Sequence, residues 1–202
     1  MRGMKPAAVP ALVLALAACA AAPVAPGRPP PGDDPSPYFP LAVGNTWTFA
    51  DQSPALPDAS RGATRTIRIV GRTADGFFRD DQGNELRGGP DCVRDRVRQL
   101  LCGPLKPGTR WTSTVSVGST ERYEIVATGE TVATPAGSFD RCVRVRATNR
   151  ASGGVENVLE TTYAPGVGQI RIETWALVGG KVSPQFRAVL ASYRVSAAQG
   201  AR

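Results

Sequence analysis

The sequence predicts an all-β protein. Roughly nine or ten short segments alternate apolar and polar residues, turns containing Gly or Pro separate them, and almost no segment shows helical periodicity. A sheet of that many strands has to curl or fold over on itself. We therefore expect a single strongly curved antiparallel sheet, a partial barrel, with a two-sheet β-sandwich as the alternative.

The first 18 residues are predicted to be an export signal. A basic head with Arg2 and Lys5 precedes an apolar run over 7–18, which is shorter than the roughly 20 residues that span a bilayer. The order Leu-Ala-Ala-Cys over 16–19 resembles the lipobox of bacterial lipoproteins. This resemblance implies cleavage before Cys19, a diacylglycerol on its thiol and acylation of the new N-terminus. An ordinary signal peptide followed by a chance cysteine is the alternative.

The mature chain is expected to consist of a tether, one domain and a tail. Residues 19–37 are rich in Ala and Pro and cannot bury enough apolar surface to fold, so they form a largely extended tether. The β-domain covers residues 38–196, and residues 197–202 form a disordered tail. No later apolar run is long enough for a transmembrane helix.

One pattern occurs twice in the domain. Residues 40–48 and 104–112 share Pro-Leu-x-x-Gly-x-x-Trp-Thr, five fixed positions at one spacing. Pro and Gly bracket a turn, and the tryptophan then begins a strand with its ring directed inward. The repeat therefore predicts two strand-rich halves related by duplication. An aromatic ligand platform made by Trp47 and Trp111 is the functional alternative to a role in the core.

The remaining elements follow from alternation and turn residues. In the strand over 64–70, Ile67 and Ile69 share one face. The acidic segment 80–84 is predicted to be a hairpin turn and not a calcium loop, because it lacks the spacing of an EF-hand. Further strands are expected over 76–79, 85–87, 111–117, 121–127, 141–148, 155–163, 169–177 and 186–195, with turns over 131–139, 151–154, 164–168 and 179–180.

The segments that contain Cys92, Cys102 and Cys142 each fit more than one structure. Residues 91–102 fit either a short helix or a hairpin centred on Val97, and the all-strand context favours the hairpin. A hairpin would place Cys92 opposite Cys102, and a disulfide between them would stabilise the fold by about 2–3 kcal/mol. Cys142 is an odd cysteine, which we expect a neighbouring segment to cover, although pairing with Cys92 or Cys102 stays open.

The composition argues against catalysis. The chain has no histidine, which removes the commonest general base and zinc ligand. A hydrolase using paired carboxylates is the enzymatic alternative, but the candidate acids are scattered: Glu124, Asp140, Glu156, Glu160 and Glu173. We predict no enzyme activity, no cofactor and no metal site.

The charge is moderately basic. The formal net charge is +7, and removal of Arg2 and Lys5 with the signal leaves +5. The arginines are spread along the strands, so the chain is not predicted to bind nucleic acid.

Three segments together resemble a group of uncharacterised bacterial secreted proteins and lipoproteins. They read YFPLAVGNTW over 38–47, TPAGSFDRCV over 134–143 and YAPGVGQ over 163–169. The resemblance covers most of the domain in that order. It implies an envelope β-domain and no catalytic role, because the shared residues are mainly Gly, Pro and aromatics.

Two functions fit these predictions. The first is a non-enzymatic envelope lipoprotein, anchored by Cys19, that acts as an interaction or assembly module for an unidentified envelope protein, with Arg144 and Arg146 in an exposed patch. The alternative is a carrier of a lipid or another apolar ligand in the concavity of the sheet. Ala20 after the cysteine resembles the outer-membrane sorting pattern. The candidate residues for an apolar lining are Trp47, Phe77, Phe78, Trp111, Trp175 and Phe186.

Overall fold

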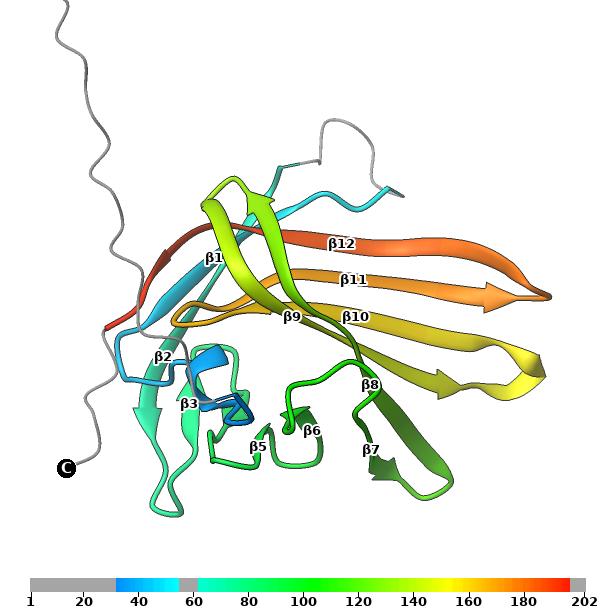
Figure 1. The fold of residues 1–202 in the computed structure, drawn as a ribbon, viewed down its shortest axis with the longest axis horizontal. Helices are drawn as coiled ribbons and strands as arrows, with labels where there is room; N and C mark the ends of the chain where they lie inside the picture. Colours follow the sequence, from blue (N-terminus) through cyan, green and yellow to red (C-terminus); the bar gives the residue numbers. More distant parts are fainter. Residues whose placement is uncertain (1–31, 55–61, 197–202) are drawn as a thin grey trace, which may run out of the picture.

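The computed structural model describes residues 32–54 and 62–196, and this part is nearly all β (Figure 1). One antiparallel sheet has ten strands in the order β4-β3-β2-β1-β12-β11-β10-β9-β8-β7, and β5 and β6 form a separate pair. The sheet is curved and open, which confirms the predicted single curved sheet. The strands are β1 Thr46–Asp51, β2 Thr64–Arg72, β3 Phe78–Asp80, β4 Glu85–Leu86, β5 Cys92–Arg94, β6 Gln99–Cys102, β7 Arg110–Ser116, β8 Ser119–Thr134, β9 Gly137–Arg150, β10 Glu156–Ala164, β11 Gly168–Val178 and β12 Lys181–Arg194.

Alternation along the strands sets which side chains are buried. Trp47 and Phe49 are buried on β1, while the residues beside them are more exposed. On β9, Val143 and Val145 are buried, and the arginines between and after them point to the other face. The period of two in the sequence therefore predicted the inward positions correctly.

The longest strands are bent by bulges. β8 and β9 pair along almost their whole length, with register shifts at three places. Each shift inserts an extra residue on one strand and increases the local twist, so the hairpin curls with the sheet. Because these bulges keep the pairing continuous, the predicted turn over 131–139 is too long: only Pro135 and Ala136 lie between the two strands.

The repeated motif forms the same corner twice. Gly44 donates its backbone N–H to the carbonyl oxygen of Ile69 (2.9 Å), and Gly108 donates in the same way to Ile125 (2.8 Å). Both glycines have a positive φ, 93° and 87° respectively, which a residue with a Cβ rarely adopts. In both corners the tryptophan three residues later lies at the start of a strand that pairs with the next one.

The β5–β6 hairpin bridges the two ends of the open sheet. Cys92 pairs with Cys102 in the hairpin, as predicted, and the two form a disulfide. On one side Arg94 exchanges backbone hydrogen bonds with Arg87, just after β4. On the other side the N–H of Gln99 donates to the hydroxyl of Ser113 on β7 (3.0 Å). Figure 1 shows the hairpin between β3 and β7.

The core has two clusters joined by Phe39. Its ring lies 6.4 Å from that of Trp47 and 6.1 Å from that of Tyr163. The first cluster, around the hairpin, contains Tyr38, Phe39, Val93, Leu101, Tyr123, Ile125, Val143, Val145, Ala147 and Tyr163. The second contains Trp47, Phe49, Ile69, Val132, Cys142, Ala164, Val167, Ile170, Ala188 and Leu190.

The folded contacts begin before the predicted domain start at Tyr38. Pro35 is fully buried, and the carbonyl of Pro37 accepts a hydrogen bond from the N–H of Gly166 (2.7 Å). A Cβ on Gly103 would collide with the carbonyl oxygen of Asp33, so this position needs glycine. Cys19, the tether up to residue 31 and the tail over 197–202 lie outside the described residues. Within the described residues, no helix has the length and apolarity needed to cross a membrane.

Candidate functional site

A cavity of about 370 Å³ lies where β1 and β2 face the β3–β4 turn and the loop of the β5–β6 hairpin. Six segments that are separate in the sequence contribute lining residues, so the cavity is a product of the tertiary fold. Its lining residues are Phe39, Trp47, Phe49, Ile67, Ile69, Asp80, Gly83, Asn84, Glu85, Leu86, Asp95, Arg96, Val97, Arg98, Leu100 and Gln169.

The inner part of the cavity is apolar. Phe39, Trp47, Phe49 and Ile69 are buried, and Ile67 is half-buried beside them. These side chains come from the segment after the 3-10 turn Ser36–Tyr38 (η1) and from the inward positions of β1 and β2. They form a continuous aromatic and aliphatic surface of the kind that lines small-molecule sites.

The ring of Trp47 is held in one orientation. Its Nε1–H donates to the carbonyl oxygen of Val167 at 2.6 Å, a buried hydrogen bond. Gly168 has a φ of +108°, and a Cβ at this position would lie 3.3 Å from the indole nitrogen. The indole therefore has no polar group left for a ligand and presents apolar surface to the cavity.

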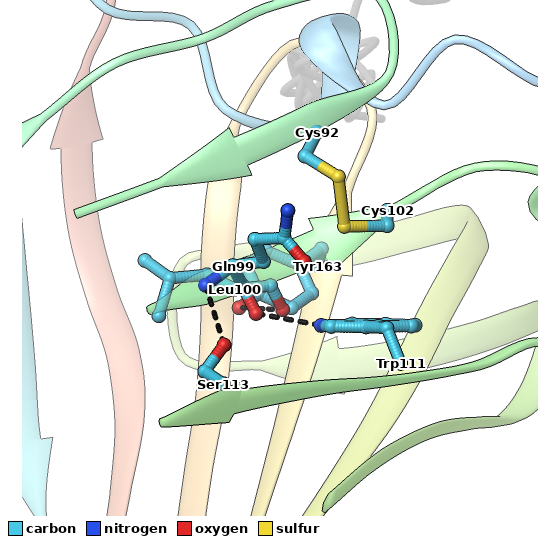
Figure 2. The surroundings of a disulfide bond; sticks show 7 residues. All are labelled: Cys92, Gln99, Leu100, Cys102, Trp111, Ser113 and Tyr163. Atoms are coloured by element: carbon cyan, nitrogen blue, oxygen red, sulfur yellow. Dashed lines mark hydrogen bonds between the residues drawn. A yellow bond between two sulfur atoms is a disulfide. The ribbon is translucent and has the colours of Figure 1, made fainter. Parts of the chain in front are cut away.

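The disulfide hairpin forms one wall of the cavity, and Figure 2 shows how the sheet holds it. The Nε1–H of Trp111 donates to the carbonyl oxygen of Gln99 at 2.7 Å. The hydroxyl of Tyr163 lies 3.5 Å from the carbonyl oxygen of Leu100. Together with the Gln99–Ser113 bond, these contacts fix β6 to β7 and β10. Leu100, which lines the cavity, is therefore carried on an anchored strand.

Ion pairs hold the loop of the hairpin against the β3–β4 turn. The guanidinium of Arg96 pairs with Asp75 and with Glu85, and it lies 3.9 Å from the centre of the Phe77 ring. Glu85 also accepts a hydrogen bond from Arg79. The hydrogen bonds from Arg79 and Arg96 lower the pKa of Glu85, and the bond from Arg96 lowers the pKa of Asp75. Both carboxylates are therefore ionised at neutral pH.

The β3–β4 turn is stabilised from within. The buried carboxylate of Asp80 accepts hydrogen bonds from the backbone N–H groups of Gln82 and Asn84 and from the side-chain amide of Asn84. This arrangement confirms the predicted hairpin turn over 80–84. In the described part of the chain, no group of three or more His, Cys, Asp or Glu side chains could hold a metal ion.

Of the six predicted lining residues, Trp47 alone lines this cavity. Phe77 is buried beneath the guanidinium groups of three arginines, and Phe78 lies against Arg72. Trp111 stacks on Tyr123, with ring centres 5.4 Å apart. Phe77 and Trp111 serve packing, whereas Phe78 also lines a separate hollow of about 700 Å³ together with Leu41 and Val195.

The other two predicted lining residues belong to a different surface. Trp175 and Phe186 line a separate hollow of about 320 Å³ on β11 and β12, together with Pro54 and Pro184. The sequence pattern does not mark Phe39 and Phe49 as lining residues, and it places Ile67 and Ile69 only on one face of a strand. Alternation along β1 and β2 was the available signal for the inward residues, but it does not distinguish packed residues from those beside a cavity.

Cys142 is buried, and in the described part of the chain it is a free thiol, because Cys92 and Cys102 bond to each other. Its thiol lies in the second core cluster, where it contacts the carbonyl oxygen of Phe139 at 3.2 Å. Burial raises the pKa of the thiol to about 11. A neutral, buried thiol is unreactive, so this cysteine has a packing role.

Four of the five carboxylates named for a hydrolase, Glu124, Glu156, Glu160 and Glu173, pair with arginines, and Asp140 accepts a hydrogen bond from the Thr131 hydroxyl. Glu160 on β10 lies opposite Glu173 on β11. Glu160 is buried, accepts a hydrogen bond from Arg146 at 2.8 Å and pairs with Arg144 at 3.4 Å. Glu173 pairs with Arg187. Since arginine binds both acids, the pair resembles a structural ion-pair network.

Comparisons with known proteins yield two structures. No protein-family model and no curated protein matches the chain. The first is a Bacteroides fragilis protein assigned as exported, with a YmcC-like fold. Its sequence is 18% identical to this chain and its TM-score is 0.46, and the match covers 77% of this chain and 98% of that protein. A Parabacteroides distasonis protein assigned as a lipoprotein is 13% identical with a TM-score of 0.43, covering 78% and 98%. Neither description names a ligand, substrate or partner.

Proposed function

We propose that this chain is a non-enzymatic envelope lipoprotein that binds an apolar ligand in the cavity between the curved sheet and the disulfide hairpin. The observation that carries the proposal is the cavity itself. Its volume of about 370 Å³ lies within the range of roughly 300–1,000 Å³ that is typical of ligand pockets. Protein cores are otherwise close-packed, with few voids larger than a water molecule.

The cavity favours ligand binding over the interaction module that ranked first from sequence. An interaction module requires a filled core and a free surface patch, for which Arg144 and Arg146 were the candidates. Both arginines instead pair with the buried Glu160, and Arg144 also pairs with Glu130 (3.1 Å). These ion pairs compensate the charges of both arginines within the sheet, while no side chain of residues 32–54 or 62–196 fills the cavity.

The ligand is expected to be small. A cavity of about 150 Å³ lined by apolar residues binds benzene, so simple scaling gives roughly 15 non-hydrogen atoms for this site. A single acyl chain of medium length or a molecule with two aromatic rings meets this limit, whereas a complete phospholipid exceeds it.

Binding can be tested with 1-naphthylamine, an uncharged probe with two aromatic rings whose fluorescence depends on the polarity of its surroundings. The full chain with Cys19→Ser, which receives no lipid, is titrated with the probe. The variant Val97→Trp places a large ring on the loop that lines the cavity, and we expect it to weaken binding about tenfold or more. Val117→Trp is the matched control, because Val117 is fully exposed at the β7–β8 turn.

Two results would contradict the proposal. If the parent chain does not bind the probe, the cavity is not a ligand site. If Val97→Trp and Val117→Trp bind as tightly as the parent, the probe binds elsewhere and the cavity has no role in its binding.

The proposed location is the outer membrane, with the chain held by lipid on Cys19. The support is the order Leu-Ala-Ala-Cys over 16–19 and the Ala20 that follows. Membrane fractionation of the host tests it: the parent chain should partition with outer-membrane markers, and Cys19→Ser should move to the soluble fraction. Continued partitioning of the serine variant with outer-membrane markers would contradict anchoring through this cysteine.

A further inference from the structure

We infer that the charges around the cavity make it select uncharged apolar chains over anionic ones of the same length, such as fatty acids. The inference rests on the proposed function and adds the chemical class of the ligand. It is carried by the polar groups of the lining, because these are the groups that a ligand head would meet.

The first arginine of the lining is already neutralised. Arg96 pairs with Asp75 and with Glu85, and its guanidinium plane covers the ring of Phe77. Three of the five guanidinium N–H groups of Arg96 are bonded to these carboxylates. An anionic head group on the remaining two would meet a charge that two carboxylates already compensate, so it would gain little net affinity.

The second arginine of the lining is held in the same way. The Nε–H of Arg98 donates to the carboxylate of Glu121 at 3.0 Å, and a second ion pair to Asp95 measures 3.6 Å. Glu121 is in turn hydrogen-bonded by the hydroxyl of Tyr123. This guanidinium is therefore directed toward β8 and its partners, and a ligand in the cavity would compete with both carboxylates.

Among the described charged residues of the lining, the one that is not paired with Arg96 or Arg98 is Asp80, and its charge is negative. Asp80, Glu85 and Asp95 line the cavity, against Arg96 and Arg98, which leaves an excess of one negative charge among these described groups. An anionic head group would thus lose its hydration beside like charge, and both effects oppose binding. An uncharged hydroxyl has a much smaller desolvation cost, and the apolar chain gains the same burial in either case.

The test compares two ligands that differ only in the head group. Dodecanol and dodecanoate carry the same chain and meet the size limit of the cavity. Isothermal titration of the full chain with Cys19→Ser, at neutral pH and below the concentration at which either ligand aggregates, measures both affinities. We expect dodecanol to bind about tenfold or more tightly than dodecanoate, which corresponds to about 1.4 kcal/mol.

The variant Asp95→Asn tests whether charge causes the selectivity. Asp95 Oδ1 accepts the backbone N–H bonds of Val97 and Arg98, and an asparagine retains this oxygen, so the loop keeps its shape. Removing the charge should raise the affinity for dodecanoate about threefold or more relative to the affinity for dodecanol. A change of loop structure would instead alter both affinities together.

The outcomes separate this inference from the proposed function. If neither ligand binds, the proposed ligand-binding function fails, and the inference fails with it. If dodecanoate binds as tightly as dodecanol or more tightly, ligand binding stands and the charge selectivity is refuted. If Asp95→Asn shifts both affinities equally, the selectivity does not arise from the charge of the lining.

Discussion

The disulfide hairpin should contribute strongly to stability, because it joins the two ends of the open sheet and forms one wall of the cavity. Cys92 and Cys102 are separated by ten positions in the sequence. The chain-entropy relation for a closed loop of this length gives about 2.7 kcal/mol at room temperature. We therefore expect the double variant C92A/C102A to lose about 2–3 kcal/mol of unfolding free energy. Alanine is chosen because Cys102 is buried and a serine hydroxyl would need a partner there.

Urea denaturation followed by tryptophan fluorescence measures this loss. In thermal denaturation of a chain of this size, each kcal/mol of unfolding free energy shifts the melting temperature by about 2–4 °C. The melting temperature of the variant should therefore be roughly 5–11 °C lower than that of the parent. The parent chain treated with a reductant is the control for the two substitutions. It should lose a similar amount, because the unfolded chain then gains the same freedom.

The hydrogen bonds of Gln99 and Leu100 to the sheet do not depend on the disulfide. The variant should therefore keep a docked β6 and bind the neutral probe, with a lower stability. A loss below about 0.5 kcal/mol would refute the reasoning, because it would show that the unfolded chain gains little freedom when the bond is removed. A native-like melt without probe binding would show that the bond, and not the sheet, positions the wall.

Three further predictions concern buried polar groups. Trp47→Phe leaves the carbonyl of Val167 without its donor and should lower the unfolding free energy by about 1–3 kcal/mol in urea denaturation. Trp111→Phe loses an exposed hydrogen bond and should lower it less, so equal decreases would contradict this reasoning. Glu160→Gln removes the charge that two arginines share and should cost about 1–3 kcal/mol in the same assay, and an unchanged midpoint would show that the network contributes nothing. Cys142 should resist an aromatic disulfide reagent until the protein unfolds, and rapid labelling of the folded chain would contradict its burial. Burial raises the pKa of this thiol from 9.0 to about 11. Its contribution to the unfolding free energy should therefore be fully present below pH 9 and be lost as the pH rises through 11.

Local features of the sequence determined the fold class and most of the elements. Alternation predicted that Ile67 and Ile69 share one face of β2, and Gly and Pro residues marked the hairpin turns. The repeated Pro-Leu-x-x-Gly-x-x-Trp-Thr motif predicted two equivalent corners, and the cysteine spacing predicted the hairpin and its disulfide. Each of these features depends on residues that are close together in the chain, so it can be recognised from the sequence.

The tertiary structure alone decided the cavity. It forms where Phe39, β1, β2, the β3–β4 turn and the hairpin loop meet, and no local pattern shows whether apolar residues from distant segments fill the space between them. Trp111, Phe77 and Trp47 look alike as aromatic residues in strands, yet only Trp47 lines the cavity. The partners of Arg96 were equally hidden, because Asp75 and Glu85 approach it only after the hairpin docks on the sheet. Packing and ion pairing across the sheet depend on three-dimensional position, which the order of residues does not directly reveal.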